Sequence, residues 1–408
     1  MNLQSGTYYW PITFPNAPSY PALEEDLSCD VLIIGGGSSG AQCAYYLADT
    51  NLDVVVIEKA KIGSGSTSTN TALIQYSGEK MFTDLINTFG ENYIKRHLDL
   101  LKEAINEIEA ASNNVSIDCE FSRRDTLYSA SCAEDVESLK KEYEFLKQNN
   151  CELTFLTKDH IEARYPFSRD AAIYSYNDAE INPFRFTHAL LDYSTEKGIR
   201  VYEHTEMNGH HFDKEQGKMI VSTKNGWSIQ ASYVIFAAGY EGMEIKKEKK
   251  ASFVSTYTVT TNPVEDLSEW YNRTLIWETA RPYLYLRTTK DNRIIIGGLD
   301  DTTTYPEDRD SKLIHKKNKL IEEFNKMFPN IRVQPEYYLT AFYGGILDGI
   351  PIIGKYEEYP NSYFLFAFGD NGTVYSQLLS KLIVEEIVEG NSPDLALYLQ
   401  ERPLLNKG

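Results

Sequence analysis

The stretch VLIIGGGSSGAQCAYYLADTNLDVVVIEK, residues 31–59, constrains the fold more than any other part of the chain. An apolar run precedes a glycine-rich turn, an apolar helix-forming segment follows, and a second apolar run ends the stretch. This order predicts a βαβ unit whose glycine turn joins the first strand to the helix. We therefore expect an α/β fold with a parallel sheet covered by helices.

Three glycines in the turn fit the pattern G-x-G-x-x-G. Gly35 permits the sharp turn, Gly37 lets the backbone approach a pyrophosphate, and Gly40 lets helix and strand pack closely. Amide groups around Ser38, at the start of the helix, would bind phosphate oxygens. Glu58 follows Gly40 by 18 residues and would accept the ribose hydroxyls of an adenosine. A carboxylate there would repel a 2′-phosphate, so the motif predicts a dinucleotide other than NADP.

The glycine motif alone permits either NAD or FAD, and three further stretches favour FAD. The loop KIGSGSTSTN, residues 61–70, is rich in small residues and could wrap a pyrophosphate and a ribityl chain. The run YVIFAAGY, residues 233–240, ends an apolar strand in small residues that could pass close to the adenosine. FAFGDNGTVYSQLLSKL, residues 366–382, repeats the order of strand, glycine turn and helix. A helix N-terminus there would stabilise the negative charge of a reduced flavin.

Composition narrows the possible partners and the location. The 408 residues carry a formal net charge of −19, which disfavours nucleic acid and anionic membrane as partners. The five cysteines are widely spaced without a C-x-x-C pair, and no histidines stand at metal-ligand spacing, so we expect no metal site. We find neither a signal peptide nor an apolar run of transmembrane length, and we expect a cytoplasmic protein.

The quoted stretches resemble the D-amino-acid oxidase-like FAD-dependent oxidoreductases, the superfamily of glycine oxidase and sarcosine oxidase. The resemblance extends over about residues 30–391 and is most specific in Arg281–Gly298, Leu347–Gly354 and Phe366–Gln377. It is closest to a poorly characterised branch that carries D-G-x-P-x-I-G. The resemblance implies noncovalent FAD as cofactor and hydride acceptor, and amines or amino acids as substrates.

The resemblance also implies positions for the cofactor. On the ADP and ribityl side it places Gly35, Gly37, Ser38, Gly40, Glu58, Ser66 and Asn70, with Met207 acting through its backbone. We add Lys59, Ser64, Thr67, Ala238 and Gly239, which belong to the same loop and to the second strand end. Near the flavin ring it places Gly369, Asn371, Gly372 and Thr373.

The predicted elements suggest two interleaved domains in an α/β, or α+β, two-domain fold. Helical periodicity covers about residues 82–113, 134–148, 183–197, 312–327 and 374–389, and strands dominate residues 253–298. We predict a discontinuous Rossmann-like FAD-binding domain and an interleaved antiparallel-sheet substrate domain. Their ranges are 28–80, 155–250 and 335–400 for the FAD-binding domain, 81–154 and 251–334 for the substrate domain, and 1–27 for an extended N-terminal arm.

The chain departs from the family pattern at three points. Glycine oxidase-like members usually carry an arginine shortly before D-G-x-P to grip the substrate carboxylate, but residues 342–348 contain none. No cysteine lies beyond Cys151, so the covalent flavin link of sarcosine oxidase-like members is absent. Asp370 stands where relatives often have glycine or histidine, and its charge would oppose an anionic flavin unless it points away or caps the helix.

The candidate catalytic residues lie in and near PYLYLRTT, residues 282–289. Strand alternation places Tyr283, Tyr285 and Arg287 on one face. That face is either a half-exposed sheet surface or a cavity wall over the flavin, where the tyrosines would contact an ammonium or apolar group and Arg287 an anionic one. Tyr343 could complete the wall.

We expect an FAD-dependent oxidoreductase that oxidises the C–H next to an amine, with oxygen or another electron acceptor reoxidising the flavin. Hydride would pass to flavin N5, and the imine would then hydrolyse. Two alternatives stay open at this point, an NAD-dependent dehydrogenase and a flavin-binding protein without turnover.

Overall fold

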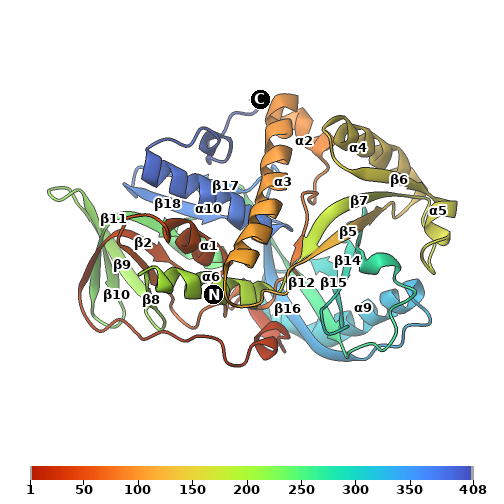
Figure 1. Ribbon diagram of the computed structural model, residues 1–408, viewed down its shortest axis with the longest axis horizontal. Coiled ribbons are helices and arrows are strands. Elements are labelled where there is room, and N and C mark those ends of the chain that lie inside the picture. The colour runs from red at the N-terminus through yellow and green to blue at the C-terminus, as the bar shows by residue number, and fades with distance from the viewer. Residues whose placement is uncertain (1, 406–408) are drawn as a thin grey trace.

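Two β-sheets organise the computed structural model, which describes residues 2–405 (Figure 1). The first sheet has the strand order β17 (Ile352–Gly354), β18 (Ser362–Phe366), β11 (Ser228–Phe236), β2 (Leu27–Ile34), β3 (Val54–Ile57) and β8 (Arg200–Tyr202). Two further strands extend it from β11: β10 (Lys218–Thr223) pairs with β11, and β9 (Met207–Asp213) pairs with β10. From β18 to β8 all pairs are parallel. The residues of β3 are fully buried, as expected for a parallel strand covered on both faces.

Helices from distant parts of the chain cover one face of this sheet. They are α1 (Ser38–Leu47), α6 (Pro183–Glu196), α10 (Gly372–Glu389) and α3 (Glu91–Asn114). The helix α1 packs against both α6 and α10, and α10 also contacts the long helix α3 (Figure 1). The N-termini of α1 and α10, more than 300 residues apart in sequence, are thereby brought together, as the hydrogen bond between Ser39 Oγ and Ser376 Oγ (2.8 Å) shows.

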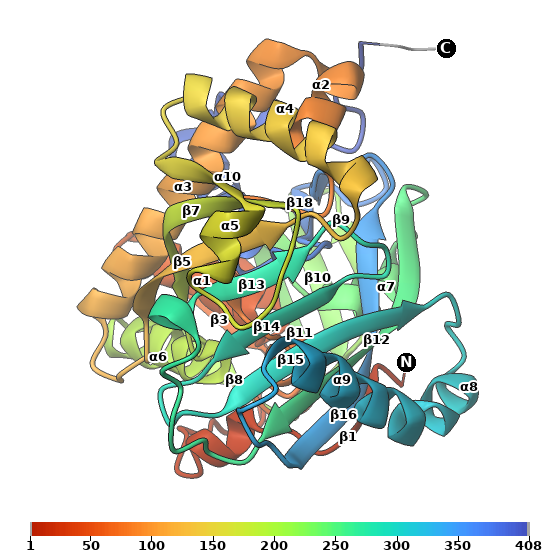
Figure 2. The same ribbon diagram turned by 90° about the vertical axis from the view of Figure 1, so that its right-hand side faces the viewer.

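The second sheet has ten strands and is mixed. Its order is β1 (Gln4–Gly6), β16 (Pro335–Ile346), β12 (Ala251–Thr261), β15 (Ile294–Asp301), β14 (Leu284–Thr288), β13 (Leu275–Glu278), β5 (Ser122–Ser129), β7 (Ala171–Glu180) and β4 (Leu73–Ile74), with β6 (Leu153–Thr157) also paired to β7. One pair, β13 with β5, is parallel. The sheet is therefore mixed, whereas the prediction was an antiparallel sheet. The helix α9 (Leu313–Met327) packs on β12, β15 and β16, and α4 (Val136–Gln148) packs on β6 and β7 (Figure 2).

The remaining helices are short. They are α2 (Phe82–Phe89), α5 (Lys158–Glu162), α7 (Gly242–Ile245) and α8 (Pro306–Ser311). The helix predicted over residues 82–113 is divided into α2 and α3 at Gly90, whose φ of 90° interrupts the helical backbone. Among residues 2–405, no helix combines the length and apolar character needed to cross a bilayer.

The two-sheet architecture agrees with the predicted α/β, two-domain fold, but the sheets do not follow the predicted domain ranges. The strand β7 lies within the range 155–250, and β16 begins the range 335–400, yet both pair in the ten-stranded sheet. The strand β16 is hydrogen-bonded to β12, and β7 is hydrogen-bonded to β5, so both belong to the ten-stranded sheet. We therefore propose a division in which β7 and β16 belong to the substrate domain.

The N-terminal arm is mostly extended and crosses from one sheet to the other. Its strand β1 pairs antiparallel with β16. Gln4 Nε2 donates to the backbone oxygen of Ser64 (2.9 Å), and Trp10 Nε1 donates to that of Asn70 (2.6 Å). The arm therefore holds the small-residue loop that follows β3.

Candidate active site

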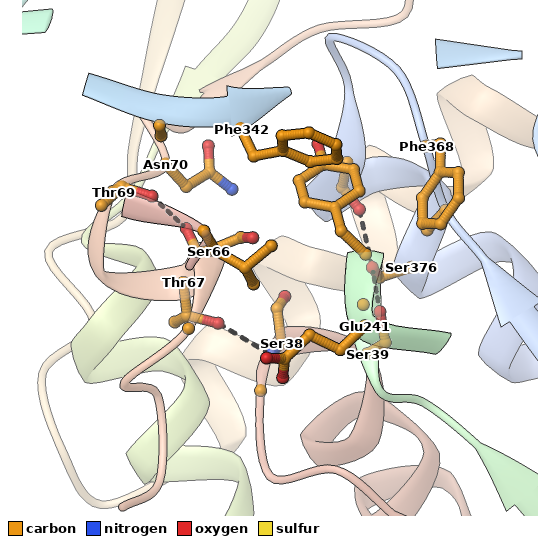
Figure 3. Close-up of a pocket in the computed structure, with 18 of the residues that line it drawn as sticks. Ser38, Ser39, Ser66, Thr67, Thr69, Asn70, Glu241, Phe342, Phe368 and Ser376 are labelled. Carbon is orange, nitrogen blue, oxygen red and sulfur yellow. Dashed lines mark hydrogen bonds between the residues drawn. The ribbon is translucent and has the colours of Figure 1, made fainter. Parts of the chain in front are cut away.

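One cavity of about 570 Å³ is lined by residues from both sheets. Ligand pockets commonly measure about 300–1,000 Å³, so this volume suits a small molecule. The glycine turn after β2 and the loop after β3 line it from the first sheet, and β14 and β16 line it from the second. Figure 3 shows Ser66, Thr67 and Asn70 on one side of the cavity, with Phe368 and Ser376 on the other.

The glycine turn has the tight geometry that the motif predicts. Gly35 has a φ of 116°, and a Cβ there would lie 2.4 Å from the backbone oxygen of Ala237. A Cβ on Gly40 would lie 1.9 Å from the oxygen of Gly35, so this residue allows α1 to pack against the turn. Gly37 and Ser38 both line the cavity at the N-terminus of α1. The backbone is thus open to a ligand where the helix dipole favours negative charge.

Glu58 lies at the end of β3 and lines the cavity. Its carboxylate accepts hydrogen bonds from the backbone N–H groups of Gly36 and Ala60, both at 2.8 Å. Burial raises the pKa of Glu58, and these two hydrogen bonds oppose the rise. Each carboxylate oxygen can accept a further hydrogen bond, so the group can bind a hydroxyl pair. Its neighbour Lys59 forms an ion pair with Glu241 (2.6 Å) at the same end of the cavity.

The loop after β3 closes over the start of α1. Thr67 Oγ1 accepts from the backbone N–H of Ser38 (3.0 Å), which fixes the loop to the glycine turn (Figure 3). Asn70 Nδ2 donates to Thr373 Oγ1 (2.9 Å) and so ties the loop to α10. Ser64 and Ser66, which precede Thr67 in the loop, also line the cavity.

The second glycine turn lies at the N-terminus of α10. Gly369 has a φ of 129°, and Asn371 Nδ2 donates to the backbone oxygen of Ser77 (2.7 Å). Asp370 lines the cavity between them, and its Oδ2 atom is buried without a hydrogen-bond partner. Burial, assisted by the negative charge of Glu79, raises the pKa of Asp370 to about 7. The side chain of Asp370 therefore does not turn away from the cavity, and the backbone N–H groups of Asp370 and Asn371, at the start of α10, oppose the rise of its pKa.

Aromatic side chains enclose the cavity near Asp370. Tyr283, Tyr285 and Tyr343 all line it, as does Trp277 from the neighbouring strand β13. The rings of Tyr283 and Tyr285 lie 5.6 Å apart, and Trp277 meets Tyr283 edge to face at 6.3 Å. Burial raises the pKa of Tyr343 well above its usual value, so the hydroxyl stays protonated at neutral pH.

Several polar atoms that line this end of the cavity have no hydrogen-bond partner within the described chain. They are Gln75 Oε1, Trp277 Nε1, Asp300 Oδ1, Tyr343 OH and Asp370 Oδ2. Gln75 is 4% exposed and Trp277 is 2% exposed, so solvent does not compensate for these missing bonds. Buried polar groups are nearly always hydrogen-bonded, and such a group of exceptions marks a place where a ligand supplies the partners.

Three of the predicted residues do not line the cavity. Gly40 serves helix packing, and Thr373 bonds to Asn70. The prediction that Arg287 forms part of the cavity wall is corrected, because its side chain is buried away from the cavity. Its Nη1 donates to the backbone oxygens of Thr71, Ala72 and Ile181 at 2.7–3.0 Å.

The other predicted residues all line the cavity. On the cofactor side these are Gly35, Gly37, Ser38, Glu58, Lys59, Ser64, Ser66, Thr67, Asn70, Met207, Ala238, Gly239, Gly369, Asn371 and Gly372. The sequence reasoning missed Gln75, Trp277 and Asp300. Asp300 follows the apolar run IIIGGL of a strand end, a position that could have indicated a site residue. Gln75 and Trp277 carry no such local signal.

A comparison with protein-family models identifies the class of protein. The family described as FAD dependent oxidoreductase matches residues 30–386, and the chain belongs to this family. It is an FAD-dependent oxidoreductase, and the NAD-dependent and non-enzymatic alternatives are set aside.

Individual relatives are distant. The chain is 26% identical over 408 residues to a Bacillus subtilis (strain 168) protein, YhfW, named as a Rieske 2Fe-2S iron-sulfur protein, covering 98% of this chain and 76% of that one. It is also 26% identical to gamma-glutamylputrescine oxidoreductase of Escherichia coli (strain K12), covering 94% and 89% of the two chains. Among solved structures, glycine oxidase from Geobacillus kaustophilus superposes with a TM-score of 0.77 at 20% identity, covering 92% and 99%.

The cavity fits the cofactor of the family. The glycine turn offers a backbone cradle in which Gly35 and Gly36 have no room for a Cβ. Glu58 can take ribose hydroxyls, and the N-terminus of α10 reaches the same cavity from the opposite end of the chain. None of the five cysteines, all of which are described, lines the cavity.

Proposed function

We propose that this protein binds FAD noncovalently in the cavity and oxidises the C–H next to an amine. The observation that carries the proposal is the continuity of the cavity, which joins the glycine turn at one end to buried carboxylate and tyrosine groups at the other. The names of two relatives support it, because glycine and gamma-glutamylputrescine both contain an amine.

The cofactor-binding residues predicted from the sequence have proposed roles along the cavity. Gly35, Gly37 and Ser38 would bind the pyrophosphate through their backbone, and Glu58 would bind the adenosine ribose. Asn371 and Gly372, at the N-terminus of α10, would face the flavin ring. When bound, FAD supplies N5 as the acceptor of a hydride from the substrate carbon, and water would hydrolyse the imine to a carbonyl compound and ammonia, or an amine where the substrate nitrogen carries a second carbon.

The chain's own residues would bind and orient the amine. Asp370 Oδ2 would accept a hydrogen bond from the substrate ammonium and take its proton, so that the neutral amine is the form that reacts. Tyr283 and Tyr343 would contact the substrate with their rings and limit the access of water. Trp277 Nε1–H would donate to an acceptor atom of the cofactor or substrate.

The experiment is anaerobic mixing of the purified holoenzyme with primary amines, secondary amines, N-methyl amino acids and D-amino acids. We expect at least one of these classes to bleach the visible absorbance of oxidised flavin, while glycerol 3-phosphate, an alcohol, leaves it unchanged. Flavin that is bleached by the alcohol and by no amine would refute the proposed reaction. Acid precipitation should release all of the FAD into solution, as noncovalent binding requires.

The electron acceptor, oxygen or another oxidant, and the cytoplasmic location remain predictions. Catalytic turnover with oxygen compared with an artificial acceptor would identify the former, and cell fractionation would test the latter.

A further inference from the structure

Asp300, on β15, lines both the main cavity and an adjoining side pocket of about 240 Å³. Tyr283 and Tyr343 also line both spaces, and Glu79 lines the side pocket. The Oδ1 atom of Asp300 is buried and has no hydrogen-bond partner. Burial raises the pKa of Asp300 to about 6, against the opposing effect of a hydrogen bond from Thr256. Above pH 7 the cavity therefore contains a carboxylate charge that the protein leaves partly unsatisfied.

The charges of Lys316 and Arg281 lower the pKa of Asp300, and Arg281 also lines the side pocket, but both side chains donate their hydrogen bonds to other groups. Lys316 Nζ donates to the backbone oxygen of Leu299 (2.6 Å). The guanidinium of Arg281 donates to the backbone oxygen of Ala280 (2.8 Å) and lies over the ring of Tyr283 at 4.9 Å. Among residues 2–405, no lysine or arginine forms an ion pair with Asp300. A buried carboxylate without an ion-pair partner is costly, so a cationic ligand would be bound strongly.

Two of the other four unpartnered atoms around the cavity, Gln75 Oε1 and Asp370 Oδ2, are acceptors, whereas Trp277 Nε1–H is a donor and Tyr343 OH can act as either. Gln75 Oε1, whose side chain is 4% exposed, can only accept a hydrogen bond. Asp370 Oδ2 can likewise only accept one when Asp370 is ionised. The ring of oxidised flavin has a single N–H donor and can satisfy only one such acceptor. The remaining acceptors require a donor-rich ligand, and a protonated amine offers up to three N–H groups together with a positive charge.

We propose that Asp300 binds a second, distal cationic group of the substrate, so that this enzyme acts on diamines or polyamines in preference to amines with a neutral or anionic tail. The inference rests on the proposed function, in which Asp370 receives the nitrogen next to the oxidised carbon. The rings of Tyr283 and Tyr343 would contact the chain between the two nitrogens or the distal cation itself.

The test uses the FAD-loaded enzyme at pH 8, where Asp300 is ionised. We would titrate it anaerobically with α,ω-diamines of three to six carbons, with monoamines of the same length and with the corresponding ω-amino acids. Dissociation constants come from the perturbation of the flavin spectrum, and reduction rates from its bleaching. For the best-fitting length we expect the diamine to bind at least ~10-fold more tightly than its monoamine, as a hydrogen bond to a buried charge provides.

The variant Asp300→Asn should abolish this preference, because it lowers the affinity for the diamine at least ~10-fold more than the affinity for the monoamine. Asp301→Asn is the matched control, because the carboxylate of Asp301 is already paired with Lys312 (2.7 Å), and it should keep the preference. The inference is overturned if no diamine is favoured, if the ω-amino acids bind best, or if Asp300→Asn retains the wild-type ratio. Binding without bleaching by any amine would instead refute the proposed function, since the affinity ratio is read independently of reduction.

Discussion

At the residue scale, the glycine turn shows how little space the fold leaves beside the cofactor cavity. A Cβ on Gly40 would lie 1.9 Å from the backbone oxygen of Gly35, and backbone atoms there cannot move aside without displacing α1. A Cβ on Gly65, which also lines the cavity, would meet nothing within 4 Å. The two positions therefore make a matched pair for substitution.

We predict that Gly40→Ala lowers the free energy of unfolding by about 3 kcal/mol, a value at the upper end for overpacking, and reduces the FAD content of the purified protein. Gly65→Ala should change neither. Urea unfolding and the ratio of flavin to protein absorbance provide the two measurements. Equal FAD binding by both variants would show that the turn is not packed as described.

Asp370 should make amine binding depend on pH. Folding raises the pKa of Asp370 to about 7, so the carboxyl is neutral below that pH and ionised above it. The affinity for an ammonium substrate should therefore be fully present above pH 7 and fall as the pH decreases, by up to about tenfold per unit. In Asp370→Asn the profile for a monoamine, which has no second cationic group for Asp300, should lose this dependence between pH 5 and 8. A profile that is unchanged in the variant would assign the dependence to another group.

Arg287 marks the limit of inference from strand alternation. The pattern places it on the same face as Tyr283 and Tyr285, and the two tyrosines do line the cavity. Arg287, however, is long enough to reach three backbone oxygens beneath the neighbouring loop, and Glu180 lies 3.7 Å from its Nε. A period of two gives the face of a strand, but it does not show which element covers each end of that face.

At the scale of elements, the N-terminal arm joins the two sheets across the mouth of the cavity. Gln4 lines the cavity and bonds to Ser64 and Ser68 of the loop that follows β3. The arm thus stabilises the loop in the position where it would enclose FAD.

We predict that Gln4→Ala accelerates the dissociation of FAD by about tenfold, because three side-chain hydrogen bonds of about 1 kcal/mol each, to Ser64, Ser68 and Thr69, are lost and water replaces most of their effect. Ile12→Ser, in the same arm, is the control, since its side chain is 61% exposed and should not affect the loop. Fluorescence of released flavin measures the rate. Identical rates for the wild type and Gln4→Ala would contradict this role of the arm.

Local patterns predicted most elements but not all their partners. The βαβ unit, α6 and α9 follow from apolar periodicity, and the structure contains them close to the expected ranges. The strand β7 was not predicted, and its end at 177–180 contains Asn and Asp, which favour a loop. Pairing with β5 and β6 overrides that local preference, and only long-range contacts could have indicated it.

At the scale of the whole molecule, the cavity depends on segments that are far apart in sequence. The glycine turn could be predicted because its chemistry is local, and the turn before α10 because it repeats that pattern. The contribution of Gln75 and Trp277 could not, since the two residues come from different elements and only the folded arrangement brings them to one space.

The central claim is that this space holds an amine against the flavin for oxidation of its adjacent carbon. Single-turnover stoichiometry tests it most directly: the holoenzyme is reduced anaerobically by a primary amine, and reduced flavin and carbonyl product are quantified together. The account predicts one equivalent of aldehyde and one of ammonia for each flavin reduced. Flavin that stays oxidised with every amine, or that is reduced without formation of a carbonyl product, would contradict it.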